Sequence, residues 1–365
     1  MNPLRLLAAV TGSPRLLGAG PQAPAAPVRV PPVSLSGTGG TAPAPDRPGP
    51  RARLRAWAEL LRISALFTVP GDALAGAASA GLRPGRGTAL AVGASLCLYE
   101  AGMALNDWAD RDEDAVDRPH RPIPSGRVAP GAALTAAGAL TAAGLALAAR
   151  AGRPALAVAS GLAATVWAYD LHLKHTKLGP AAMAAARTLD LLLGATATAG
   201  TAAPATPAPR AAARPAGVRA PAAALPAALA LGTHTYAVTA VSRHEVQGGS
   251  TAAPLAALAG AAALGAALLR GRPARGEPPR PRAAAGGLLL TTFTGAYLRT
   301  SAIPLVHAAL NPSPPLTRRA VGGGIRAMIP LQAALAARAG SPLDGLAVMG
   351  LVPLARALAR KVSPT

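Results

Sequence analysis

Apolar runs separated by short polar or proline-rich segments recur along most of this 365-residue chain. Most of the runs approach the roughly 20 residues that a helix needs to cross a bilayer. They predict nine membrane-spanning helices, or ten if a shorter apolar stretch at 342–360 is included. The fold class is therefore expected to be an all-α, polytopic membrane helical bundle. The predicted spans are 56–81, 88–109, 131–150, 154–171, 180–202, 221–242, 251–270, 284–308 and 320–338.

The first part of the chain has a different pattern. Residues 1–52 are rich in proline, glycine, alanine and arginine and have no sustained apolar period, which predicts a disordered tail. The piece Leu6–Val10 is too short for the apolar core of a signal peptide. Residues 53–365 are expected to form one transmembrane domain.

Composition supports the membrane class. Charged residues make up only 14% of the chain, whereas soluble domains carry about a quarter. The net charge of +21 would suggest nucleic-acid binding in a soluble protein. Here the arginines fall mostly between apolar runs, so the expected partner is the lipid bilayer and no nucleic acid.

Counting crossings from the tail places three polar loops on the tail's side of the membrane. These loops, 110–130, 172–179 and 243–250, hold most of the unusual polar residues. The seven arginines between Arg5 and Arg55 tip the balance of positive charge toward this side. The positive-inside rule then predicts a multi-pass protein of the cell membrane with a cytoplasmic motif face.

Acidic residues are concentrated in one place. The chain has 15, and six of them lie between Asp107 and Asp117. Asn106, Asp110 and Asp114 follow the spacing i, i+4 and i+8, which places them on one stripe of a helix. Asp107 and Asp112 are expected to point away from that stripe. Oxygen ligands suit Mg²⁺, and the alternative is a solvated, charged helix end.

A basic loop follows the acids, from Arg118 to Arg127. Its three prolines restrict the backbone, and its arginines can bind phosphate oxygens through their planar donors. Metal-binding acids beside anion-binding arginines indicate a ligand such as a diphosphate. The alternative is an interfacial loop whose arginines meet lipid headgroups.

These residues resemble the first signature of the UbiA family of intramembrane prenyltransferases. The pattern is Asn-Asp-x-x-Asp-x-x-x-Asp from Asn106, then Arg-Pro-x-Arg-Pro-Ile-Pro-Ser-Gly from Arg118. The segment Tyr169–His175 resembles a second family feature, and 187–194 and 242–249 are similar to the EboC-like branch. The resemblance implies a bundle of about nine helices over residues 53–360.

The resemblance also implies an activity, which is Mg²⁺-dependent transfer of a prenyl group from a prenyl diphosphate to an aromatic or other lipophilic acceptor. Under it, the catalytic residues would be Asp110, Asp114, Lys174 and Tyr169. Asn106, Asp110, Asp114 and Glu245 would bind metal. Arg118, Arg121, Asp170 and Arg243 would bind substrate.

The second Asp-rich motif that such enzymes carry is altered here. The corresponding stretch, His234–Glu245, contains no Asp, and Glu245 is its only carboxylate. His234 stands as a possible replacement for an acid. Because of this departure, an alternative stays open. The protein would then be a non-catalytic relative that binds or moves an isoprenoid or lipophilic metabolite. A secondary transporter lacks support, because the spans show no internal repeat.

A few charged residues lie inside predicted spans. Arg187 and Asp190, at i and i+3, are expected to pair on one helix, which makes both less costly in lipid. Asp72 and Glu100 have no obvious partner nearby in the sequence, which makes each of them a pocket candidate.

Overall fold

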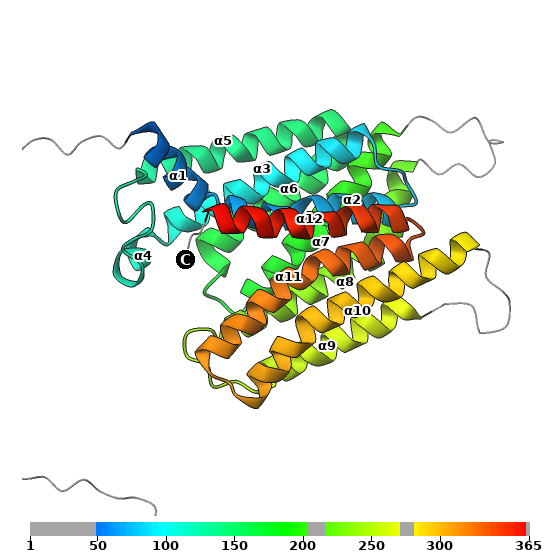
Figure 1. Cartoon of the computed structure of the whole chain (residues 1–365). Helices are drawn as coiled ribbons and strands as arrows, with labels where there is room; N and C mark the ends of the chain where they lie inside the picture. The colour runs from blue at the N-terminus through cyan, green and yellow to red at the C-terminus, as the bar shows by residue number, and fades with distance from the viewer. Residues whose placement is uncertain (1–48, 203–215, 271–280, 363–365) are drawn as a thin grey trace, which may run out of the picture. The chain divides into compact units, whose positions relative to one another are not determined.

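The computed structural model describes residues 49–202, 216–270 and 281–362. The predicted tail therefore falls almost wholly outside the described residues, and its disorder stays a prediction. Within the described ranges every regular element is a helix (Figure 1). The elements are α1 Pro50–Leu60, η3 Ile63–Thr68, α2 Val69–Ser79, α3 Arg86–Ala109, α4 Arg111–Asp117, α5 Pro130–Ala151, α6 Arg153–Ala168, η4 Tyr169–Leu173, α7 Gly179–Thr201, α8 Ala216–Ser242, α9 Ala252–Leu269, α10 Pro281–Leu310, α11 Pro314–Arg338 and α12 Pro342–Val362.

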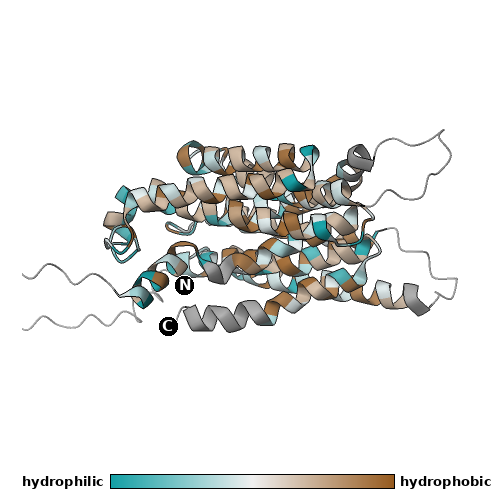
Figure 2. Ribbon diagram, turned by 90° about the horizontal axis from the view of Figure 1, so that it is seen from above, coloured by the Kyte–Doolittle hydropathy of each residue, from teal (hydrophilic) through white to brown (hydrophobic). Residues whose placement is uncertain are grey.

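Eight of the nine predicted spans appear as single helices or as a helix with a short extension. The shorter stretch at 342–360 is α12. Among the described residues, six helical segments are long and apolar enough to cross a bilayer: Arg86–Ala109, Pro130–Ala151, Arg153–Leu173, Pro221–Ser242, Ala252–Leu269 and Pro314–Arg338. Figure 2 shows hydrophobic residues along the helices and hydrophilic residues in the connecting turns at their ends.

The first predicted span, 56–81, is wrong as one continuous helix. It divides into α1, η3 and α2. Arg62 has φ = 49°, a left-handed conformation that an L-residue cannot continue as a right-handed helix. The chain re-enters a helix at Val69, where Pro70 fits the first turn because it has no N–H to leave unpaired. This break places Arg62 beside the end of α3.

Two long helices organise the bundle. Helix α7 packs against α2, α3, α6 and α8, and α11 packs against α2, α8, α10 and α12. The turn between α5 and α6 is a single residue, Gly152, with φ = 122°. Only glycine adopts that conformation without strain, so this position fixes α5 and α6 as close neighbours.

Small residues let α2 and α7 approach closely, as they do in helix pairs within lipid. A Cβ atom added to Gly76 of α2 would lie 2.1 Å from the carbonyl oxygen of Leu191 in α7. A Cβ on Gly194 of α7 would lie 2.5 Å from the Cα of Ala73 in α2. Neither backbone atom can rotate away, so α2 and α7 tolerate only glycine at these contacts.

Gly76→Ala is expected to destabilise the protein by about 1–3 kcal/mol, because the added methyl forces two backbones apart. The matched control is Gly138→Ala in α5, where an added Cβ meets nothing within 4 Å. The measurement is the apparent Tm of each purified variant in detergent. Equal Tm values for the two variants would contradict the close approach of α2 and α7.

Candidate functional site

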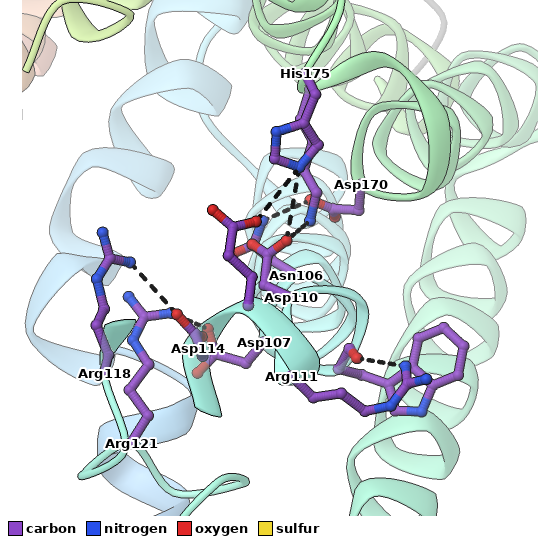
Figure 3. Close-up of polar contacts among 12 residues, drawn as sticks. Asn106, Asp107, Asp110, Arg111, Asp114, Arg118, Arg121, Asp170 and His175 are labelled. Carbon is purple, nitrogen blue, oxygen red and sulfur yellow. Dashed lines mark hydrogen bonds and ion pairs between the residues drawn. The ribbon is translucent and has the colours of Figure 1, made fainter. Parts of the chain in front are cut away.

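The acid-rich segment lies where α3 ends and α4 begins (Figure 3). Asp110 separates the two helices, but the i to i−4 backbone hydrogen bonds continue through it. The amides of Asp110, Asp114 and Arg118 donate to the carbonyls four residues earlier, over 2.9, 2.7 and 2.8 Å. The predicted stripe of Asn106, Asp110 and Asp114 therefore survives the break between the helices.

Arginines from two segments bind two buried acids here, Asp114 of the stripe and Asp107 beside it. Asp114 is 3% exposed, and its Oδ2 accepts from Arg121 over 2.7 Å. Arg118 lies 3.6 Å from the same carboxylate. Arg121 also donates to Oδ1 of Asp107 over 3.2 Å, and Arg62 donates to the same oxygen over 3.1 Å. Arg121 is thus the bridge between two buried carboxylates.

Asp107 differs from the expectation. It faces the arginines and is buried, instead of pointing away from the cluster. Asp112 does point away, with its side chain 88% exposed. The difference arises because Arg62, brought close by the break after α1, supplies a cation on the Asp107 side. Sequence spacing within one helix gives no indication of that long-range partner.

Residues after α6 complete the cluster from a second direction. Lys174 forms an ion pair with Oδ1 of Asp110. The amide nitrogen of Asn106 donates to Asp170 in η4 over 3.1 Å, which leaves the amide oxygen of Asn106 to face a cation. The structure thus joins the two predicted motifs through the Lys174–Asp110 and Asn106–Asp170 contacts.

Two residues outside the predicted metal-binding set could also bind a cation. The ligand atoms of Asp110, Glu113 and His175 lie within 4.8 Å of one another. Glu113 is one helical turn from Asp110, and His175 follows Lys174. Their positions within the two motifs are the sequence features that could have identified them as possible ligands. The donors in this region are mainly oxygens, which fits Mg²⁺ better than a softer metal.

The basic loop is held against α1. Arg127 forms two hydrogen bonds with Glu59, of 2.6 and 3.1 Å, and these bonds raise the pKa of Arg127. Ile123 and Val128 are buried in the loop and belong to a core cluster with Leu60. Arg127 therefore anchors the loop, whereas Arg118 and Arg121 point toward the acids.

The altered second motif also reaches this region. Arg243 donates to the backbone carbonyl of Thr176, which ties the loop after α8 to the loop after η4. Partial burial raises the pKa of Glu245, and the nearby guanidinium groups of Arg318 and Arg118 oppose that shift. Arg118 thus interacts electrostatically with Glu245 as well as with Asp114.

His234 does not face the cluster. It is 4% exposed, and Nε2 bonds the carbonyl of Gly324 over 2.9 Å. The hydroxyl of Tyr297 lies 3.2 Å from Nδ1. With Nε2 donating to the carbonyl, Nδ1 accepts from Tyr297. The interpretation of His234 as a substitute for a metal-binding acid is wrong, because its ring joins α8 to α10 and α11.

A cavity of about 320 Å³ begins beside the acid stripe. Asn106, Tyr169 and Asp170 line it at one end, together with Arg62. Its walls are largely apolar and come from α3, α6 and α7. Tyr169 and Asp170 thus lie at the cavity and can contact a bound molecule there. The remaining lining residues are Ser95, Leu98, Tyr99, Gly102, Met103, Leu162, Val166, Met183, Ala186, Arg187 and Asp190.

A buried ionic cluster of Asp72, Arg187 and Asp190 lies along this cavity. Arg187 pairs with Asp72 as well as with Asp190, which is 3.8 Å away. Gln332 of α11 donates to Asp72 over 2.6 Å, and Ser95 of α3 donates to Asp190. The expected Arg187–Asp190 pair is present, and Asp72, which has no partner nearby in the sequence, pairs with Arg187 from 115 residues away.

Comparison with known proteins gives this arrangement a family. Residues 64–249 match the model of the UbiA prenyltransferase family, which is more than half of the chain. The chain belongs to the UbiA prenyltransferase family. The matched range contains both segments of the acid cluster and the altered second motif, so the predicted resemblance is confirmed. The EboC-like branch stays a prediction.

Two relatives are digeranylgeranylglyceryl phosphate synthases of archaea. The one from Methanopyrus kandleri is 37% identical over 130 residues, 34% of this chain and 46% of the relative. The one from Ignicoccus hospitalis is 32% identical over 148 residues, 40% of this chain and 48% of the relative. The matches span less than half the length of these curated relatives.

Solved structures of UbiA homologs share the fold. A homolog from Archaeoglobus fulgidus bound to GPP and Mg²⁺ superposes with a TM-score of 0.53 at 18% identity, covering 81% of this chain and 99% of that one. A homolog from Aeropyrum pernix K1 gives 0.51 at 19% identity, covering 72% and 96%. With six apolar helices and this family fold, the protein is a multi-pass membrane protein.

Proposed function

We propose that this UbiA-family protein transfers a prenyl group from a prenyl diphosphate to a lipophilic acceptor and that it uses Mg²⁺. One observation carries the proposal. The acid stripe at Asn106, Asp110 and Asp114 lies between the basic loop and the mouth of a largely apolar cavity. That arrangement suits a ligand with an anionic head and an apolar tail, which is the chemistry of a prenyl diphosphate.

The oxygen-bearing side chains would hold the metal. Asn106, Asp110 and Asp114 lie along one helical stripe, and Glu245 is the only carboxylate of the second motif. Mg²⁺, when bound, would neutralise the charge that grows on a leaving diphosphate. The arginines and Lys174 now paired with these acids would turn to the phosphate oxygens, because anion and acids compete for the same donors.

The apolar cavity would bind the prenyl tail and exclude water. Departure of the diphosphate leaves an allylic cation, which water would quench in an open site. Tyr169 lines the cavity, where its aromatic ring would stabilise this cation. The acceptor nucleophile would then bond to the allylic carbon, and its proton would leave to Asp170 or to solvent.

The site would face the cytoplasm, as the distribution of arginines predicts. The two archaeal relatives are named for synthesis of digeranylgeranylglyceryl phosphate. A glyceryl phosphate ether therefore belongs among the acceptors to be tested, beside aromatic and other lipophilic compounds.

The direct experiment incubates the purified protein in detergent with radiolabelled prenyl diphosphates, Mg²⁺ and each acceptor class. We expect a labelled lipophilic product and release of diphosphate, both lost when the metal is chelated. Absence of product and of diphosphate release with every donor, in protein shown to bind a donor, would contradict the enzymatic function.

A further inference from the structure

The cavity beside the acid stripe follows one face of α3. The α3 residues that line it recur every three or four positions between Ser95 and Asn106, as expected for a single face. At 1.5 Å per residue, the distance along the helix between these two residues is about 16 Å. Its middle section presents apolar side chains such as Leu98, Leu162 and Val166.

The end of the cavity farthest from the acid stripe is polar. Ser95 lies there, bound to Asp190 of the buried ionic cluster. Arg187 and Asp190 also line the cavity, with side chains 12% and 9% exposed. A cavity that holds an anionic head at one end thus meets a second charged group at the other.

This polar end is fixed in place by four helices. Asp72 lies on α2, Ser95 on α3, Arg187 and Asp190 on α7, and Gln332 on α11. Helix α7 packs against both α2 and α3 (Figure 1). The side chains bind one another across these helices, so a tail pressing on them cannot push the cluster aside without breaking its hydrogen bonds.

We propose that the buried ionic cluster is the end stop of the prenyl-tail site and sets the longest donor that this protein accepts. The inference rests on the proposed function. An apolar tail that reached the cluster would cover its polar groups without offering them hydrogen bonds. Such burial of polar groups is unfavourable. Tail binding is therefore favourable only along the apolar section.

The length of that section gives a number of isoprene units. Each unit contributes four chain bonds, or about 5 Å when extended, by the bond lengths of ordinary carbon chains. The distance of about 16 Å between Ser95 and Asn106 is the upper limit for that section, and it holds about three such units. The cavity accordingly fits donors of up to about 15 carbons and excludes the last unit of a 20-carbon donor.

Binding of a series of prenyl diphosphates with 5, 10, 15 and 20 carbons tests the end stop. Affinity is measured by equilibrium binding to the full-length protein in detergent with Mg²⁺. We expect affinity to increase up to 15 carbons and to fall at least about tenfold at 20 carbons. Equal or tighter binding of the 20-carbon donor would overturn the end stop and leave the proposed function standing.

Asp190→Leu is the matching variant. It removes one acid and leaves the Arg187–Asp72 ion pair balanced, while Ser95 can turn its hydroxyl to its own helix backbone. We expect the ratio of 20-carbon to 15-carbon affinity to rise at least about tenfold. Asp190→Asn keeps the end polar and is expected to leave this ratio unchanged.

The ratio separates an end stop from a merely structural cluster. Loss of stability lowers the binding of both donors in the same sample and does not change their ratio. An unchanged ratio in folded Asp190→Leu protein would overturn the proposal. Where that variant fails to fold, the length profile of the natural protein decides. Failure to bind any diphosphate would overturn the proposed function and the end stop together.

Discussion

Asp110→Asn is expected to lower the rate of prenyl transfer by at least about a hundredfold, because the carboxylate would hold the Mg²⁺ that stabilises the leaving diphosphate. Asp110 lies at the centre of the cluster, bound to Lys174 and close to Glu113 and His175. Asparagine keeps the size of the side chain and removes its charge. The measurement is kcat/KM for the donor at saturating Mg²⁺, with the concentration of Mg²⁺ needed for half-maximal rate as a second readout.

The control for this variant is Asp112→Asn. Asp112 belongs to the same acidic run but is 88% exposed on α4, so the same loss of charge should leave the rate within about twofold. If Asp110→Asn retained the natural rate and the natural requirement for Mg²⁺, Asp110 would not be a metal ligand. Equal losses in both variants would indicate a general effect of net charge.

Arg121→Met is expected to destabilise the protein by about 3 kcal/mol, because removing one partner leaves buried carboxylates without compensation. Arg121 contacts both Asp107 and Asp114. Asp107 keeps Arg62 at 3.1 Å, but Asp114 keeps only Arg118 at 3.6 Å. We expect a lower apparent Tm together with weaker donor binding.

Arg118→Met is the control for the stability effect. Its side chain is 53% exposed and its contact with Asp114 is long, so its loss should change the stability by less than about 1 kcal/mol. Donor binding should still weaken if Arg118 meets the diphosphate. Equal Tm losses in the two variants would contradict the assignment of Arg121 as the bridge between buried acids.

Local features of the site could be predicted from the sequence because they depend on spacing within one element. The i, i+4 stripe of Asn106, Asp110 and Asp114 is such a feature, and the backbone hydrogen bonds through Asp110 keep the helical register that it requires. Counting crossings also predicted which loops meet. The contacts of Lys174 with Asp110 and of Arg243 with Thr176 join all three of those loops.

Features that depend on contacts between distant segments could not be predicted from the sequence. The partners of Asp107 and Asp72 lie 45 and 115 residues away, in Arg62 and Arg187. Hydropathy also gave no sign of the break within the first predicted span, because it depends on the left-handed backbone at Arg62. His234 is a further example, because its partners, Tyr297 and Gly324, lie on helices far along the chain.

The acid stripe and the basic loop together are proposed to form a site for a metal and a diphosphate. The most direct test is equilibrium binding of a non-reactive prenyl thiolodiphosphate to the natural protein, once with Mg²⁺ and once with the metal chelated. We predict that tight binding requires Mg²⁺, since the acids repel an anion unless a cation lies between them. Equal affinity under both conditions would contradict the claim.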